Sequence, residues 1–361
     1  MGFAKRSISR CVPLSTYSGM RKTIIIIVGV IIPVGLIFLV YKGYNVLFEA
    51  NVNESITPYT LYVDEETSIE EVYAKFIEDE VLLAPEGFLL LANKKGLISP
   101  KPGHYIIKSG QSSNSIVNTL MAGFQEPVTI QFNTADNLED LAGQLSKQIM
   151  ADSLSLLEAL KTERKGWEGA AIYGAYFPDT YEVYWNASAE EIAEKIYQNT
   201  IKFWSPAHLD KAARLGLSAA EVSTLASIVM KESSKTDDRP LVARLYLNRL
   251  EKGMSLQADP TVIYALKRKN PEMEVRRVLK KDLLIDDPYN TYKIKGLPPG
   301  PICVPERAAL LAVLNAPYHD YLYMCANPDK PGYHAFARNY AGHLINQRKW
   351  TAYLNRRRIY R

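Results

Sequence analysis

The segment LSAAEVSTLASIVMKESS, residues 217–234, predicts a helix whose apolar face ends on an acid. Ser218 is followed three residues later by Glu221, the pattern of a capping box, so we expect the helix to begin near residue 219. The positions that then share one helical face, at spacings of 3, 4 and 3, are Val222, Leu225, Val229 and Glu232. A carboxyl group therefore stands where the buried face should continue.

Glu232 is a candidate general acid on these grounds. Partial burial disfavours the ionised form and raises the pKa of a glutamate. The negative end of the helix dipole acts in the same direction. A glutamate that keeps its proton at neutral pH is what a general acid requires. The residues alone leave open a simpler alternative, in which the apolar face has ended and Glu232 is a solvated terminal residue.

Polar residues gather downstream of this helix. The segment RPLVARLYLNRLEKGMSLQADPTVIYAL, residues 239–266, predicts a second amphipathic helix and a turn, and then places Gln257, Asp259 and Thr261 around a proline. The segment YNTYKIKGLPPGP, residues 289–301, adds Asn290, Tyr292 and a second tyrosine before a rigid loop. Aromatic rings, amides and one buried acid together indicate a site that cleaves a sugar polymer.

The N-terminal part of the chain predicts a single transmembrane helix. Residues 24–41 read IIIIVGVIIPVGLIFLVY, without a charge between Lys22 and Lys42, and a helix of that length rises about 27 Å. Residues 1–22 carry five basic side chains and no acid, which favours a cytoplasmic N-terminus and places the rest of the chain outside. We therefore expect a cytoplasmic tail over 1–22 and an anchor over 23–42. A cleaved signal peptide is the alternative, but the apolar run is long and no small-residue cleavage pattern follows it.

The exported part is expected to be α+β. Residues 43–56 predict a polar stalk, and a strand-helix-helix-strand-helix order over about 59–123 predicts a compact βααβ binding module. We group 43–125 as the first exported unit and 126–361 as a larger, helix-rich α+β domain.

Composition excludes several functional classes. The chain has 361 residues and a net charge of +4, without a basic stripe, so nucleic-acid binding is not expected. The five histidines are scattered and no HExxH or CxxC occurs, so a metal site is not expected. Of the three cysteines, Cys11 precedes the predicted anchor, whereas Cys303 and Cys325 would lie outside, where a disulfide is permitted.

Several blocks resemble the membrane-anchored endolytic murein transglycosylases, the MltG or YceG-like family. They span the exported chain in the order of the family: KPGHYIIKSG, YFPDTY, LASIVMKES, LYLNRLEKGMSLQADPTVIY, YNTYKIKGLPPGPI and HAFARNYAGH. The resemblance implies a LysM-like peptidoglycan-binding subdomain, a following catalytic domain and a place in the bacterial cytoplasmic (inner) membrane. It also implies that Glu232 is the catalytic residue, because IVMKES aligns with the family segment IVEKET, with Met230 in place of its first acid. Gly342 replaces an acid usual beside His343, so that histidine carries little weight.

The resemblance further implies a reaction. Glu232 would protonate the β-1,4 oxygen between N-acetylmuramic acid and N-acetylglucosamine, and would then deprotonate the muramyl C6 hydroxyl, which attacks C1 to leave a 1,6-anhydro end. The substrate is then peptidoglycan, no cofactor is needed, and the enzyme would end or trim nascent strands beside the peptidoglycan synthases. We assign Gln257, Asn290 and Tyr292 to substrate binding or support of the site, and Asp259 and Thr261 to substrate binding.

Two alternatives remain at this point. A hydrolase would need a second carboxylate, for which Asp259 and Asp179 are candidates, although each is explained more simply as a turn or cap residue. A non-catalytic, membrane-anchored peptidoglycan-binding scaffold would fit the first exported unit equally well.

Overall fold

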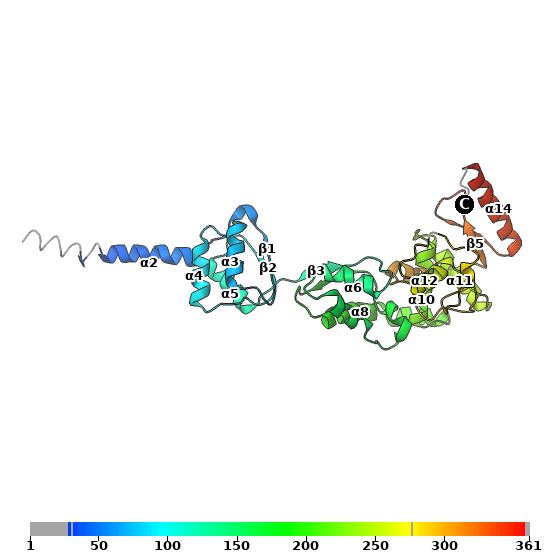
Figure 1. Ribbon diagram of the computed structural model, residues 1–361, viewed down its shortest axis with the longest axis horizontal. Coiled ribbons are helices and arrows are strands. Elements are labelled where there is room, and N and C mark those ends of the chain that lie inside the picture. Colours follow the sequence, from blue (N-terminus) through cyan, green and yellow to red (C-terminus); the bar gives the residue numbers. More distant parts are fainter. Residues whose placement is uncertain (1–27, 30–31, 276, 358–361) are drawn as a thin grey trace, which may run out of the picture. The chain divides into compact units, whose positions relative to one another are not determined.

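The computed structural model describes residues 28–29, 32–275 and 277–357 (Figure 1). It divides into two compact units, the first ending at Glu126 and the second beginning at Pro127. The expected cytoplasmic tail, residues 1–22 with Cys11, lies outside the described residues, as does part of the expected anchor.

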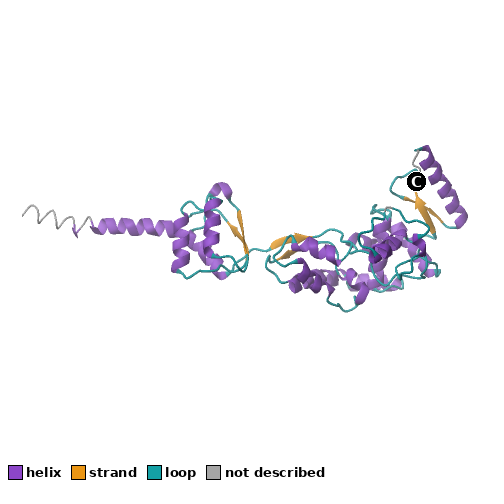
Figure 2. Ribbon diagram, viewed as in Figure 1, coloured by secondary structure: helices purple, strands orange, loops and turns teal. Residues whose placement is uncertain are grey.

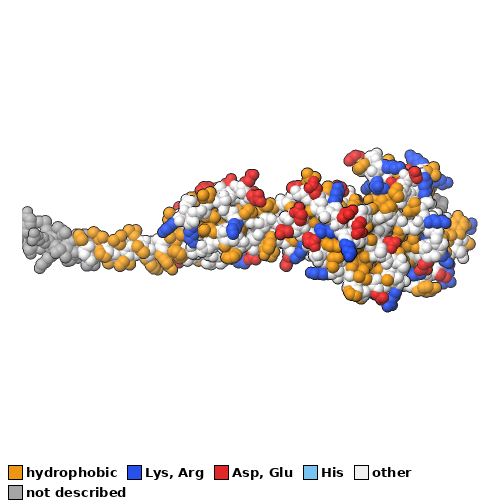
Figure 3. Space-filling view, turned by 90° about the horizontal axis from the view of Figure 1, so that it is seen from below, with side chains coloured by type: hydrophobic (Ala, Val, Ile, Leu, Met, Phe, Trp, Pro, Cys, Tyr) orange, Lys and Arg blue, Asp and Glu red, His pale blue; other side chains and the backbone are white. Residues whose placement is uncertain are grey.

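Helix α2 (Ile32–Phe48) presents apolar side chains on all sides. Every residue from Leu36 to Tyr41 is a large, exposed hydrophobic residue, and these side chains line the helix visibly (Figure 3). Within the described part of the chain, no single helix has both the length and the hydropathy to cross a membrane. Two neighbouring helices of the second unit meet both criteria only as a pair, and they are bent by 75° at their junction.

The segment expected to form a polar stalk, 43–56, is structured differently. Its first part continues helix α2 to Phe48, because no proline interrupts the chain there. Its second part packs against the first unit: Asn51 is buried, and its side chain donates to Ser113 Oγ over 2.7 Å and to Ala84 O over 2.9 Å.

The first unit has the predicted strand-helix-helix-strand-helix order, which confirms that pattern. Strands β1 and β2 pair antiparallel, with Leu61 opposite Tyr105, and both side chains are buried in the core. Ser68 and Glu71 cap the first helix of the unit with a complete capping box. The elements are β1 (Tyr59–Val63), α3 (Ile69–Glu78), α4 (Pro85–Lys94), β2 (Gly103–Ile107) and α5 (Ser113–Ala122).

The second unit is α+β and dominated by helices, as the sequence predicts (Figure 2). Its strands form two separate two-stranded antiparallel sheets, β3 with β4 and β5 with β6. The elements are β3 (Val128–Gln131), α6 (Leu138–Ser146), α7 (Ser153–Lys161), η3 (Gly169–Ala175), β4 (Thr180–Val183), α8 (Ala189–Phe203), α9 (Pro206–Arg214), α10 (Ala219–Glu232), α11 (Arg239–Glu251), α12 (Asp259–Lys269), η4 (Asp282–Leu284), α13 (Arg307–Leu314), β5 (Tyr323–Ala326), β6 (His334–Ala337) and α14 (Tyr340–Arg356).

Helix α10 lies at the centre of the second unit, beside α11 and α12 (Figure 1). The predicted capping box at Ser218 and Glu221 is present, and the helix begins at Ala219 as expected. The sequence predicts one buried face, but every residue from 222 to 230 is buried. The reason is that η3, α9, α11, α12 and α13 all contact this helix.

The proline- and glycine-rich loop after residue 295 is joined to α10 by hydrogen bonds. Ile302 N donates to Ser227 Oγ over 3.0 Å, and Ser227 Oγ in turn donates to Thr224 O over 2.7 Å. Gly300 lies directly against η3, where a Cβ atom would overlap the backbone carbonyl of Ala170. The loop therefore requires a residue without a side chain at this point.

The chain ends in a small lobe formed by β5, β6 and α14. Helix α14 packs along both strands and has no buried residue of its own. Strand β6 ends at Ala337, and helix α14 begins three residues later at Tyr340.

Gly300→Ala should lower the free energy of unfolding of the second unit by about 1–3 kcal/mol, because the new methyl group meets a fixed backbone carbonyl. Gly143→Ala is the matched control. It lies within α6 with nothing within 4 Å of the added Cβ, and should stabilise by about 0.5–1 kcal/mol. Urea denaturation followed by tryptophan fluorescence measures this unit alone, because all four tryptophans lie in it. Equal effects of the two substitutions would contradict the close approach at Gly300.

Candidate active site

A pocket of about 430 Å³ opens at the C-terminal end of α10, and several elements contribute to its wall. These are α10, α11, the loop before α12, the loop between η4 and α13 that carries Tyr292, and the lobe of β5, β6 and α14. The residues that line it are Glu232, Leu245, Tyr246, Arg249, Leu256, Gln257, Asp259, Tyr292, Tyr323, Met324, Cys325, Ala326, His334, Tyr340, His343 and Gln347.

Glu232 is the last residue of α10 and is partly exposed, because its carboxyl group opens to the pocket. Burial of the carboxyl group among the residues of the pocket wall raises the pKa of Glu232 from 4.5 to about 7. The Tyr246 hydroxyl donates to Glu232 Oε1 over 2.9 Å and opposes that rise in pKa. Burial also holds the pKa of Tyr246 far above its ordinary value, so this hydroxyl remains a donor. Glu232 can therefore hold or release a proton near neutral pH.

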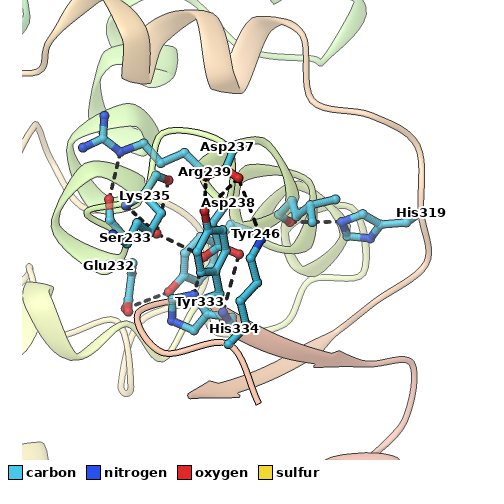
Figure 4. Close-up of polar contacts among 12 residues, drawn as sticks. Glu232, Ser233, Lys235, Asp237, Asp238, Arg239, Tyr246, His319, Tyr333 and His334 are labelled. Atoms are coloured by element: carbon cyan, nitrogen blue, oxygen red, sulfur yellow. Dashed lines mark hydrogen bonds and ion pairs between the residues drawn. The ribbon is translucent and has the colours of Figure 1, made fainter. Parts of the chain in front are cut away.

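The turn after Glu232 is held by a chain of polar contacts, shown in Figure 4. Ser233 Oγ donates to Asp238 Oδ2 over 3.0 Å, and Arg239 Nε donates to the Ser233 carbonyl over 2.8 Å. His334 Nδ1 lies 2.6 Å from the same Asp238 oxygen. Because an ionised carboxylate only accepts hydrogen bonds, Nδ1 carries the proton, which fixes the orientation of the His334 ring at the pocket wall.

Gln257, Asp259 and Tyr292, all predicted from the sequence, line the pocket together with Glu232. The Tyr292 hydroxyl donates to Asp259 Oδ1 over 2.6 Å. Gln257 has a φ of 53°, a left-handed conformation, and its backbone N–H donates to Thr291 O over 3.0 Å. That conformation is costly for a residue with a side chain, so the surrounding loop must hold it in place.

Thr261, predicted to bind substrate, and Asn290, predicted to bind substrate or to support the site, are completely buried and do not line the pocket. Thr261 Oγ1 donates to Ala258 O over 2.7 Å, and Asn290 Nδ2 donates to the carbonyls of Leu283 and Ile285. Both side chains satisfy backbone groups of irregular segments, which need such partners when buried. The structure therefore places them in support of the pocket wall. Their polarity in the sequence did not show which way they point.

Tyr246, Arg249, Tyr323 and His334 line the pocket but were not selected from the sequence. Tyr246 and Arg249 stand three residues apart on α11, and both are buried. Their spacing, two polar residues on one face of a core helix, is the sequence pattern that could have identified them as site residues. No local pattern marked Tyr323 or His334.

His343, given little weight from the sequence, also lines the pocket. Its ring stacks on Tyr323 with a centroid distance of 5.4 Å, and its Nδ1 atom is buried without a hydrogen-bond partner among the described residues. Burial lowers the pKa of His343, which favours the neutral ring.

The other groups considered from the sequence lie as follows. Asp179 does not line the pocket and instead pairs with Arg307 over 2.8 Å and with Asn199 over 2.9 Å. Cys303 is buried and Cys325 lines the pocket, and both are free thiols. Within the described ranges, no cluster of three histidine, cysteine or acidic side chains could hold a metal ion.

Comparisons with known proteins agree with this architecture. The sequence model of a family described as the YceG-like family matches residues 61–349. A curated protein of Bacillus subtilis named endolytic murein transglycosylase is 28% identical over 300 residues, which are 78% of this chain and 82% of that protein. A protein of the same name from Streptococcus pneumoniae is also 28% identical, over 66% of this chain, and this chain spans about half, 49%, of its length. The crystal structure of a yceG-like protein from Listeria monocytogenes matches with a TM-score of 0.52 and 25% identity, covering 80% of this chain and 98% of that one.

The raised pKa of Glu232 makes stability depend on pH. The folded chain holds this proton more tightly than the unfolded chain does, so the contribution is complete below about pH 4.5 and is lost as pH rises through about 7. Between pH 5 and pH 8, the unaltered chain should therefore lose about 2 kcal/mol of unfolding free energy relative to Glu232→Gln. Urea denaturation at the two pH values measures this difference. Glu158→Gln, at an exposed position of α7, controls for the substitution itself. If the difference in unfolding free energy between Glu232→Gln and the unaltered chain is the same at pH 5 and at pH 8, the pKa of Glu232 is not raised.

Proposed function

The chain belongs to the YceG-like family, and from that premise we propose that it is an endolytic murein transglycosylase, the activity for which its curated relatives are named. The bond cleaved is the β-1,4 bond between N-acetylmuramic acid and N-acetylglucosamine. The observation that carries the proposal is Glu232, a carboxyl group with a pKa of about 7 that opens to a pocket. A single such group suffices if the nucleophile belongs to the substrate.

In this reaction Glu232 acts first as acid and then as base. Its proton passes to the glycosidic oxygen as the bond to the muramyl C1 atom breaks, which releases the N-acetylglucosamine hydroxyl. The muramyl C6 hydroxyl then attacks C1, and its proton returns to the Glu232 carboxylate. No water is consumed, and the product carries a 1,6-anhydromuramyl end. A pKa near the working pH suits both steps, because the group must give up and regain one proton.

The pocket wall offers the groups that a sugar polymer requires. Tyr292 and Tyr323 present aromatic rings, and Gln257 presents an amide, beside Glu232. His334, oriented by Asp238, adds one ring nitrogen that is not bonded to that aspartate. We assign these side chains to substrate binding.

A hydrolase remains a second candidate because one specific observation favours it. Asp259 lines the same pocket as Glu232 and could serve as the second carboxylate of a two-acid mechanism. Its contact with the Tyr292 hydroxyl, and its place in the first turn of α12, favour a structural role instead.

We assign peptidoglycan binding to the first unit, as a LysM-like subdomain. Its β1-α3-α4-β2 order, with the two strands paired antiparallel, supports this assignment. A module that binds the strand apart from the cleavage site would keep the enzyme on its polymer between cuts.

We also propose that the chain is anchored in the bacterial cytoplasmic membrane by one N-terminal helix, with residues 43–361 outside. The uncharged run of residues 24–41 and the apolar surface of α2 support this arrangement. Cleavage would then be confined to strands near the membrane, beside the peptidoglycan synthases that extend them.

Glu232→Gln should abolish strand cleavage, with a loss of at least about a hundredfold in kcat, because the amide can neither donate nor accept the proton. Peptidoglycan strands incubated with the full chain and separated by length provide the assay. Activity equal to that of the unaltered chain would support a non-catalytic scaffold instead.

Asp259→Asn separates the two catalytic candidates. A transglycosylase that uses Glu232 alone should keep most of its kcat, whereas a two-carboxylate hydrolase should lose activity as completely as Glu232→Gln does. Asp179→Asn, outside the pocket, is the matched control and should leave kcat unchanged.

Tyr246→Phe should shift the alkaline limb of the pH profile of kcat/KM to higher pH. Removing the hydroxyl removes a hydrogen bond that lowers the pKa of Glu232, so the protonated acid persists further into the alkaline range. Tyr176→Phe removes a buried hydroxyl that donates to Leu160 O, away from the pocket, and should leave the profile in place. A shift to lower pH in Tyr246→Phe would show that the hydroxyl does not stabilise the carboxylate.

A further inference from the structure

Arg249 is a buried cation at the wall of the pocket without an acidic partner. Its side chain is only 7% exposed, yet it lines the pocket together with Glu232. Across the described ranges, no aspartate or glutamate forms an ion pair with it. The Tyr323 ring, whose centroid lies 5.6 Å from Arg249 Cζ, stabilises the cation but brings no negative charge, and a buried charge without a counter-charge costs several kcal/mol.

The hydrogen bonds of Arg249 occupy one side of its guanidinium group. Nε donates to Leu322 O over 2.8 Å, and Nη1 donates to Leu256 O over 2.7 Å and to Ser255 O over 3.3 Å. No acceptor among the described residues is bonded to Nη2. Because this atom is not one of the buried polar atoms that lack a partner, it is accessible from the pocket. Two N–H donors of Nη2 therefore remain for a group that enters the pocket.

The groups around Arg249 do not neutralise its charge. Its electrostatic neighbours are the hydroxyls of Tyr246, Tyr292 and Tyr323 and the carboxyl group of Glu232. Glu232 must be protonated to act as acid, and it is then neutral. The Asp259 carboxylate lines the same pocket but accepts from Tyr292 rather than from Arg249. In the state ready for reaction, the pocket thus holds a cation whose free donors await an anion.

We propose that Arg249 binds a carboxylate of the glycan substrate and so determines which strands are cleaved. This inference rests on the proposed function, which supplies the glycan. A guanidinium group suits the task because it remains charged when buried and presents donors in a planar fork.

The muramyl residue supplies two sources of that anion. One is its own lactyl carboxylate, which is free once the stem peptide has been removed and lies on the sugar whose C1 atom reacts. The other is a carboxylate of an intact stem peptide. The lactyl group is the nearer to the cleaved bond, and its recognition would select strands already stripped of peptide.

The rival explanation is that Arg249 only holds the pocket together, since its three hydrogen bonds join α11 to the loop before α12 and to the residue preceding β5. A structural role would affect all strands equally. Only recognition of an anion makes affinity depend on the charge of the substrate.

The test measures binding of peptide-free glycan strands to the full chain carrying Glu232→Gln, so that no strand is cut. The strands are compared before and after conversion of their lactyl carboxylates to methylamides. We expect the acid strands to bind about tenfold to a hundredfold more tightly, as for a hydrogen-bonded charge pair. Equal affinities of acid and amide strands, both here and in the second arm below, would overturn the proposal, and this comparison needs no change at Arg249. Strands with intact peptides, before and after amidation, form the second arm. Discrimination there alone would assign the bound carboxylate to the peptide.

Arg249→Gln, added to Glu232→Gln, should remove the preference for acid strands, and Arg249→Lys should restore part of it. Arg244→Gln is the matched control, since it removes an arginine of the same helix that pairs with Glu251 and does not line the pocket. A uniform loss of affinity for acid and amide strands in Arg249→Gln would overturn the proposal in favour of the structural role. Cleavage by the unaltered chain is assayed separately, so selective binding without cleavage would sink the proposed function and leave this inference standing.

Discussion

The second unit depends on the complete enclosure of helix α10. From residue 222 to residue 230 this helix has no exposed side, because η3, α9, α11, α12 and α13 surround it. Small side chains at Ser223, Ala226 and Ser227 allow those neighbours to approach closely. Close packing on all sides fixes the position and the rotation of this helix within the unit. Its last residue, Glu232, is therefore held at the pocket by the packing of the whole unit as well as by its hydrogen bond from Tyr246.

Enclosure also sets the chemistry of Glu232. A carboxyl group drawn out of water retains its proton unless a positive charge or several donors stabilise the anion. Here a hydrogen bond from the Tyr246 hydroxyl and the nearby positive charge of Arg249 favour the anion, and they offset the effect of burial only in part. The two effects leave the pKa of Glu232 close to neutrality, where one group can act in turn as acid and as base.

Local signals in the sequence were sufficient for the framework of the fold. The predicted capping box at Ser218 depends on residues three positions apart, and it is present. The α+β class and the order of elements in the first unit follow from such short-range patterns. Helical periodicity underestimated the burial of α10, because serines and alanines on its second face pack as closely as the valines and leucines on the first.

The site was less predictable because its contacts join distant residues. Asp238 and His334 are separated by 96 positions, and Asp259 and Tyr292 by 33, so no local pattern reveals either pair. Thr261 and Asn290 look like binding residues in the sequence, yet both are bonded to backbone carbonyls in the interior. A sequence shows which residues are polar, whereas the packing of the loops decides which of them face the pocket.

The central claim is that Glu232 works alone, with a nucleophile supplied by the substrate. Cleavage in water enriched in heavy oxygen tests this claim most directly. Mass spectrometry should find 1,6-anhydromuramyl ends without the heavy isotope, and reducing ends that contain one heavy oxygen atom would contradict the account.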